Sequence, residues 1–226
     1  MTRRPLNLAA RAAALGLTVM LWAAGQAGAQ AGLQPSPRAL LEQTSHRMVA
    51  ALDANRALLA RKPTRIYAIV EDVLVPHVDM NRASRWALGR HWREASAEQR
   101  ARFQQEFHTL LVRFYSTALV EYLNAGHEIP DGVIAFLPQR GDEAATRVGG
   151  EVTVRTVVRP ANGRAVPVNY EMHRSPEGWK VCDVTVDGVS IITAYRSVFR
   201  TEIRKHGIDG LIDTLASFNR RYAARD

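Results

Sequence analysis

The chain has 226 residues, of which 46% are hydrophobic and 23% are charged, and its formal net charge is +8 at pH 7. This composition is typical of a globular protein and excludes a low-complexity chain. The first 29 residues hold three arginines and no acidic residue, so the remainder carries a net charge of +5. That excess favours anionic surfaces. The sequence contains no block of like charges, which argues against a nucleic-acid-binding tail.

The first thirty residues have the three parts of an export signal. Arg3 and Arg4 form a basic start, an apolar run extends over residues 12–24, and residues 27–29 match a small-x-small cleavage site. We therefore predict a signal peptide over residues 1–29. The apolar run is short for a stable membrane span, and an uncleaved anchor is the alternative. No cysteine follows the cleavage site, which excludes lipoprotein processing.

Helical spacing dominates the next part of the chain. After a short linker at residues 30–37, apolar residues recur at helical intervals over residues 38–60. A second helix is predicted from Pro63, a residue that favours the first turn, and Pro76 ends it.

Two further helices are marked by capping residues. Asp79 is placed to cap a third helix, and Gly89 supplies the left-handed residue that follows its last turn. Ser96 and Gln99 form a capping box for the longest helix, which is predicted to end before Gly126.

Strand-like alternation follows, in four runs at residues 133–137, 146–159, 165–174 and 179–187. Turn sequences at 160–163 and 175–178 join the later runs as antiparallel hairpins. Helical spacing returns after Gly188, breaks at Gly207 and resumes in a last helix. The order predicts an α+β domain over residues 38–222, with helices packed on one face of a curved four-stranded antiparallel sheet.

Residues that carry chemistry are sparse. The sequence has no glycine-rich phosphate loop and no H-E-x-x-H zinc motif. The seven histidines include no pair spaced three or four apart, and Cys182 is the only cysteine, so we predict no metal, no cofactor and no disulfide within one chain. We expect the Cys182 thiol to be buried and inert, because a free cysteine behaves as a small hydrophobic residue.

A carboxylate pair is the one candidate for catalysis. Asp183 and Asp187 lie four residues apart on a predicted strand, where they are able to share a face and act as acid and base. In the alternative interpretation, Asp187 and Gly188 form the turn that leaves the strand, and Asp183 pairs with a basic neighbour. A chain of this size without a nucleophile and its base is more typical of a binding protein than of an enzyme.

A family resemblance is carried by four segments. They lie at residues 75–92 (including VPHVDM and SRWALGRHW), 97–115 (AEQRARFQQEFHTLLVRFY), 178–199 (from GWKVCD through DGVS to YRS and Phe199) and 207–215 (GIDGLIDTL). In this order and spacing they resemble the MlaC family, the periplasmic phospholipid-binding proteins of the outer-membrane lipid asymmetry (toluene tolerance) system. The resemblance extends over about residues 36–218. Cys182 departs from the pattern, in which an aromatic or aliphatic residue is expected.

The resemblance implies a fold and a function. Helices and a curved sheet are expected to enclose a deep hydrophobic cavity that holds the acyl chains of a phospholipid, with the headgroup at the mouth. The chain is then a periplasmic carrier and not an enzyme, with phospholipid as its cargo. Its implied partners are an outer-membrane lipoprotein complex and the lipid-handling subunit of an inner-membrane ABC transporter.

A cavity of this kind is expected to be lined by the inward faces of the sheet and of the helices. The candidate lining residues are Phe107, Leu111, Tyr115, Val154, Val168, Tyr170, Met172, Val184, Val186, Ile192, Tyr195 and Phe199. The alternative is that they fill a solid core, since both roles have the same pattern. Positive charge near the mouth or on docking faces is assigned to Arg90, Arg93, Arg147, Arg155 and Lys180, for which a solvated surface is the alternative.

Two other functions are consistent with the sequence. One is a cone-shaped α+β enzyme that acts on a hydrophobic substrate with Asp183 as its acid or base. The other is a periplasmic chaperone or adaptor for protein clients. Turnover that is lost in Asp183→Asn favours the enzyme, whereas a co-purified phospholipid favours the carrier.

Overall fold

The computed structural model describes residues 34–124, 133–138, 149–159 and 163–223. The chain divides into two units, Met1–Pro35 and Ser36–Asp226, and every helix and strand described below belongs to the second. The predicted signal peptide lies outside the described residues. Within the described ranges, no helix combines the length and the hydropathy needed to cross a bilayer.

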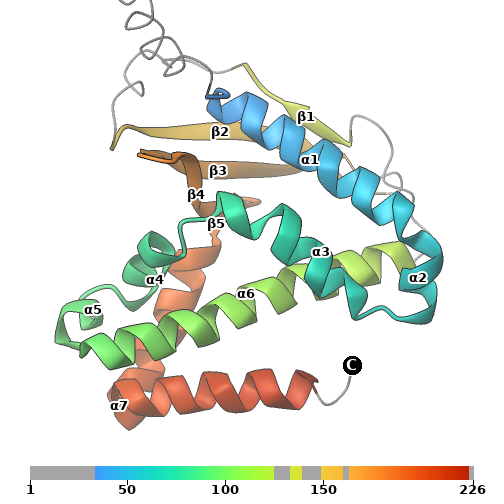
Figure 1. The fold of residues 1–226 in the computed structure, drawn as a ribbon. Helices are drawn as coiled ribbons and strands as arrows, with labels where there is room; N and C mark the ends of the chain where they lie inside the picture. Colours follow the sequence, from blue (N-terminus) through green and yellow to red (C-terminus); the bar gives the residue numbers. More distant parts are fainter. Residues whose placement is uncertain (1–33, 125–132, 139–148, 160–162, 224–226) are drawn as a thin grey trace, which may run out of the picture. The chain divides into compact units, whose positions relative to one another are not determined.

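The first half of this unit is helical (Figure 1). Its elements are α1 (Pro37–Ala54), α2 (Arg56–Arg61), α3 (Arg65–Val73), the 3-10 turn η3 (Val75–His77), α4 (Met80–Leu88), α5 (His91–Glu94) and α6 (Ala97–Asn124). The single helix predicted over residues 38–60 is wrong in one respect, because Asn55 divides it into α1 and α2. Asn55 leaves helical geometry, and its side-chain amide donates to the Ala51 carbonyl at 2.8 Å.

The predicted caps are confirmed. The Asp79 carboxylate accepts from the Arg82 backbone N–H at 2.8 Å, and Gly89 follows α4 with φ +57°. At the start of α6 the Gln99 N–H donates to Ser96 Oγ at 3.0 Å, and the Ser96 N–H donates to Gln99 Oε1 at 2.9 Å. These local bonds fix where α4 and α6 begin.

The second half forms one antiparallel sheet in the order β1-β2-β3-β4-β5. The strands are β1 (Ile134–Phe136), β2 (Glu151–Val158), β3 (Val166–Ser175), β4 (Gly178–Val186) and β5 (Val189–Ser190). The α+β class is confirmed, but the prediction of four strands is wrong. The fifth, β5, has two residues and follows a turn at Asp187 and Gly188, which both have positive φ. A strand this short cannot display the alternation by which strands are recognised.

The pairing register gives the sheet one apolar face. Val154 lies opposite Tyr170, and Tyr170 lies opposite Val184. A bulge at Cys182, where two residues of β4 face one of β3, keeps Val181 and Val184 on this face although they are three residues apart. Without the bulge, an odd spacing would place them on opposite faces.

The last element, α7 (Ile191–Ala223), is two helices joined at a corner. Gly207 breaks the helix with φ +73° and ψ −178°, as the sequence predicts. The second segment then runs back along α6 (Figure 1). Arg102 of α6 pairs with Asp209 and Asp213 there, and Asn219 Nδ2 donates to the Glu106 carbonyl at 3.0 Å.

Among the described residues, buried apolar side chains form three separate clusters. The helical cluster joins α4, α6 and α7 and consists of Ala83, Ala87, Leu88, Phe103, Phe107, Leu110, Ile192, Phe199, Ile203, Leu211, Ile212 and Leu215. The sheet cluster joins α1 to the apolar face and consists of Leu40, Leu41, Val154, Met172, Trp179 and Val181. The amino-terminal cluster joins α1–α3 to α6 and consists of Met48, Leu52, Leu59, Ile66, Val70, Val73 and Val112. Domains usually have one contiguous core. Here the sheet cluster contains no residue of α6, so α6 and the sheet pack in separate clusters.

Candidate functional site

One wall of the candidate site is a stripe along α6. Phe107, Leu111 and Tyr115 recur every four residues and therefore lie on one side of the helix. Phe107 is fully buried, Leu111 is half-buried and Tyr115 is 43% exposed. The stripe is thus tightly packed towards the amino-terminal end of α6 and loses its cover further along.

The second wall is the apolar face of β4. Trp179 and Val181 are buried beneath α1, Val184 is half-buried, and Val186 is 39% exposed. Apolar cover again decreases along the element. Two large apolar surfaces that are each incompletely covered are what a site for hydrocarbon chains requires.

Each wall has a tyrosine near it, Tyr115 on α6 and Tyr170 on β3, the neighbour of β4. Burial raises the pKa of the Tyr115 phenol, although its side chain is 43% exposed. Burial also raises the pKa of Tyr170 well above the ordinary value, and the neighbouring Tyr115 adds to the rise. The charged form of each phenol is therefore disfavoured by its surroundings.

Aromatic rings close one end of the α6 stripe. Phe107 and Phe199 lie edge to face at 5.5 Å between centroids, and Tyr195 stacks on Phe199 at 5.5 Å. Tyr195 also meets Phe107 edge to face at 5.6 Å. Burial raises the pKa of Tyr195 as well. This end is filled by protein.

The structure brings the predicted lining residues together in two groups. Phe107, Leu111, Ile192, Tyr195 and Phe199 belong to or pack against the helical cluster. Val154, Tyr170, Met172 and Val184 belong to or pack against the sheet cluster. Tyr115, Val168 and Val186 lie outside the three clusters. The assignment of all twelve residues as lining stays a prediction.

The predicted cationic residues do not form one group. Arg90 and Arg93 are exposed beside and within α5. The Arg155 guanidinium donates to the Pro138 carbonyl at 3.4 Å, and Lys180 Nζ donates to the Pro76 carbonyl at 2.6 Å. Arg147 lies outside the described residues. Lys180 therefore has a structural partner that the sequence does not reveal, because Pro76 is 104 residues away.

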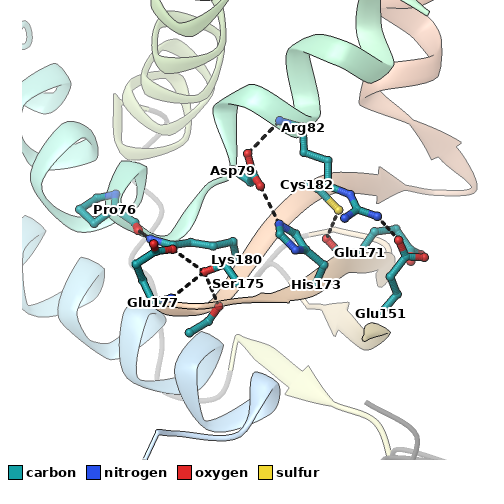
Figure 2. Close-up of polar contacts among 11 residues, drawn as sticks. Pro76, Asp79, Arg82, Glu151, Glu171, His173, Ser175, Glu177, Lys180 and Cys182 are labelled. Carbon is teal, nitrogen blue, oxygen red and sulfur yellow. Dashed lines mark hydrogen bonds and ion pairs between the residues drawn. The ribbon is translucent and has the colours of Figure 1, made fainter. Parts of the chain in front are cut away.

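A polar group on the other side of the sheet was not predicted (Figure 2). The segment after η3 pairs with the free edge of β4 through a parallel bridge between Val78 and Val181. Asp79 Oδ2 lies 2.7 Å from His173 Nε2, and the Arg82 guanidinium reaches Glu151. These contacts attach α4 to the sheet. In the sequence, the predicted cap at Asp79 was the only indication of this polar group.

The chemistry of this polar group is structural. Cys182 lies within it and donates to the Glu171 carbonyl at 3.2 Å. Burial raises the pKa of its thiol to about 12, so the thiol is protonated and is not a nucleophile at neutral pH. The expectation of a buried cysteine is confirmed. In the part of the chain that the structure describes, no three His, Cys, Asp or Glu side chains gather to hold a metal ion.

Asp183 caps α7. One carboxylate oxygen accepts from the N–H groups of Val184 at 2.7 Å and Ile192 at 3.1 Å, and the other accepts from the Ser190 hydroxyl at 2.5 Å. The prediction that Asp183 pairs with a basic neighbour is therefore wrong, because its carboxylate accepts hydrogen bonds from backbone and hydroxyl donors at the start of α7. Asp187 occupies the predicted turn and pairs with Arg164. The two acids do not form a catalytic pair.

Known proteins resemble this chain over most of its length. The family model described as MlaC protein matches residues 42–217. The toluene tolerance protein Ttg2D of Pseudomonas putida is 29% identical over 175 residues, which cover 77% of this chain and 76% of that protein. The binding protein MlaC of the intermembrane phospholipid transport system of Haemophilus influenzae is 28% identical over 185 residues, which cover 79% and 80%.

A solved structure resembles the fold as well. The phospholipid-binding protein of Ralstonia solanacearum, determined in complex with a phospholipid, superimposes with a TM-score of 0.71 at 28% identity. The match covers 84% of this chain and 99% of that chain. The family resemblance predicted from four sequence segments is thereby confirmed, and the matched residues include both walls of the candidate site. This chain belongs to the MlaC protein family.

Proposed function

We propose that this protein is a periplasmic carrier that takes glycerophospholipid between the outer and inner membranes and performs no catalysis. The relatives support the cargo, since one is named for intermembrane phospholipid transport and another was solved with a phospholipid bound. Membership of a family of phospholipid-binding transport proteins also confirms the prediction that the chain is not an enzyme.

The observation that carries the proposal is the pair of incompletely covered apolar walls. The stripe of α6 and the face of β4 belong to different clusters, and both lose their cover near Tyr115 and Val186. Acyl chains placed between them complete the packing that the protein lacks, at about 0.8 kcal/mol for each methylene removed from water. The headgroup then remains at the open end.

Directionality comes from partners. Hydrocarbon is equally shielded in a bilayer, so transfer into the carrier is close to neutral in free energy. The sequence has no phosphate-binding loop with which the carrier would use a nucleotide. We therefore assign an outer-membrane lipoprotein complex and the lipid-handling subunit of an inner-membrane ABC transporter as its docking partners.

Lipid analysis of the purified protein tests the proposal. Native mass spectrometry is expected to show one bound glycerophospholipid per chain, which solvent extraction then identifies. A lipid-free protein with a solid interior would overturn the carrier function. Co-purifying protein clients in place of lipid would favour a chaperone, and turnover abolished by Asp183→Asn would favour an enzyme.

Cell fractionation tests the location. When the full-length chain is expressed, we expect the mature protein in the periplasmic fraction with Gln30 as its first residue. A variant with Arg3 and Arg4 replaced by Glu should accumulate uncleaved in the cytoplasm, because the basic start of the signal is lost. Membrane-bound, uncleaved wild-type protein would contradict the assignment.

A further inference from the structure

The positive charge of the chain is concentrated in two stretches. Residues 80–94 and 191–206 contain eight arginines and lysines and only two acids, which gives them a net charge of +6. The whole chain after residue 29 carries +5, so its other residues together carry −1. The two stretches form α4, α5 and the part of α7 before its corner. The excess that favours an anionic partner therefore belongs to these elements and not to the molecule at large.

The fold brings the two stretches together. Arg196 of α7 donates from Nε to the Trp86 carbonyl in the last turn of α4 at 2.5 Å, and its Cδ lies 3.6 Å from where a Cβ on Gly89 would be. Arg196, Arg200 and Arg204 recur every four residues and therefore form a stripe along one side of α7. On α4 and α5, three further arginines lie one turn before Gly89 or shortly after it. Together they form what we call the basic face, whose members are all exposed: Arg85, Arg90, Arg93, Arg196, Arg200 and Arg204.

The arginines of the basic face are not neutralised by nearby acids. Among the described residues, none of the six forms an ion pair. The two acids of the stretches have other partners, since Glu94 lies 2.5 Å from His91 Nδ1 and Glu202 lies 2.9 Å from His206 Nδ1. Like charges held close together repel one another, so an anionic partner is favoured at this face.

The basic face lies far from the uncovered part of α6. Arg100, in the first turn of α6, donates to the Arg93 carbonyl at 3.4 Å, and Asp209, just after the corner of α7, accepts from Gln99 at 2.8 Å. Figure 1 shows α4, α5 and this corner at the same end of α6. Tyr115 follows Arg100 by fifteen residues, about 22 Å along the helix. A carrier that rested this face on a bilayer would therefore hold the uncovered part of α6 away from the membrane.

The chemistry of the face identifies its partner. Guanidinium groups bind carboxylates and phosphates through paired hydrogen bonds. The position of the face argues against the phosphates of a membrane. Resting on the proposed function, we propose that the basic face docks on an acidic surface of a partner protein and leaves the uncovered part of α6 free for lipid exchange. Attraction between opposite charges speeds association and is screened by salt, which suits a carrier that has to bind and leave.

Binding to the proposed docking partners tests the basic face. The periplasmic part of the transporter's lipid-handling subunit and the outer-membrane lipoprotein, both from the same organism, are immobilised separately, and lipid-loaded protein is passed over each at low and at high salt. Wild type should bind at least one of them, more weakly at high salt. A variant that combines Arg93→Glu, Arg200→Glu and Arg204→Glu should bind at least about tenfold more weakly at low salt.

The matched control reverses three cations elsewhere. Arg61→Glu, Lys62→Glu and Arg65→Glu together change the net charge by the same amount, at exposed residues at the end of α2 and the start of α3. This variant should keep the wild-type affinity. Thermal melting checks that each variant folds, and native mass spectrometry checks that it still holds lipid. If the face variant with three glutamates does not fold, the same three positions replaced by Gln should weaken binding to a smaller extent.

The outcomes separate the basic face from the carrier function. Equal weakening by both sets of substitutions, or wild-type binding to neither protein, would overturn the docking role. Wild-type binding to vesicles of phosphatidylcholine and phosphatidylglycerol, lost in the face variant, would also overturn it if neither protein is bound, because the face would then contact the membrane. A phospholipid found on the protein in these cases leaves the carrier function intact. Wild type without phospholipid would overturn the carrier function, and the docking role with it.

Discussion

At the scale of single residues, Asp183 shows what a sequence pattern reveals and what it conceals. The sequence predicts that it lies on a strand, and the structure confirms this by placing it within β4. Its role depends on Ser190 and Ile192, which approach only after the chain has turned at Gly188. Capping was predictable at Asp79 and Ser96 because those bonds span three residues. It was not predictable here, where the chain reverses between donor and acceptor.

Replacing Asp183 with Asn should therefore weaken folding and leave lipid binding intact. The amide keeps one acceptor but loses the negative charge at the start of α7, so we expect a loss of about 1–2 kcal/mol in the free energy of unfolding. Urea denaturation measures it. Asp187→Asn is the control and should change stability by less than about 0.5 kcal/mol, because its partner Arg164 is at the surface. Lost lipid with unchanged stability would contradict the capping role.

Cys182 makes stability depend on alkaline pH. Burial holds the thiol pKa at about 12, above the usual value near 9, so the unfolded chain ionises first. The contribution of the thiol is complete below pH 9 and is lost as the pH rises towards 12. The free energy of unfolding should fall by about 1 kcal/mol per pH unit within that window. Denaturation curves of wild type and Cys182→Ala isolate this slope, and identical slopes would disprove it.

At the scale of elements, local signals predicted most of the helices and the long strands, and long-range contacts explain what was missed. The break at Gly207 was read correctly, because glycine alone tolerates φ +73° with ψ −178°. The attachment of residues 78–82 to the edge of β4 was not predicted. It depends on His173 and Glu151, which lie on other strands far along the chain.

The corner at Gly207 is expected to be intolerant of a side chain. Gly207→Ala should lower the free energy of unfolding by about 1–3 kcal/mol, since alanine is strained in this conformation. The second half of α7 should then exchange its amide protons faster. Lys205→Ala is the control at an exposed helical residue two positions before the corner, and it should have little effect. Equal effects of the two substitutions would show that the corner is not strained by a Cβ.

At the scale of the whole molecule, the pattern predicted which residues are apolar and inward but not which of them are covered. Phe107 and Tyr115 lie on the same stripe of α6, yet one is fully buried and the other is 43% exposed. The spacing of apolar residues does not show how far away the next helix or strand lies. A filled core and a lipid site therefore have the same sequence pattern. The separation of the clusters appears only in three dimensions.

Filling the space between the walls should displace lipid. Val184→Trp adds a large ring beside Tyr170, so lipid occupancy should fall at least several-fold while the fold is retained, as measured by native mass spectrometry and circular dichroism. Val198→Trp is the control, because Val198 is 62% exposed on α7 and faces neither wall. Full occupancy in Val184→Trp would place the acyl chains elsewhere.

The division of the core into three clusters has a mechanical consequence. Internal space that is eliminated on unfolding makes the unfolded state the smaller one, so hydrostatic pressure favours unfolding in proportion to that space. Stripped of its cargo, this protein should denature at a lower pressure than when loaded. The pressure at the midpoint of unfolding thereby reports how much lipid the carrier holds, without any label on the lipid.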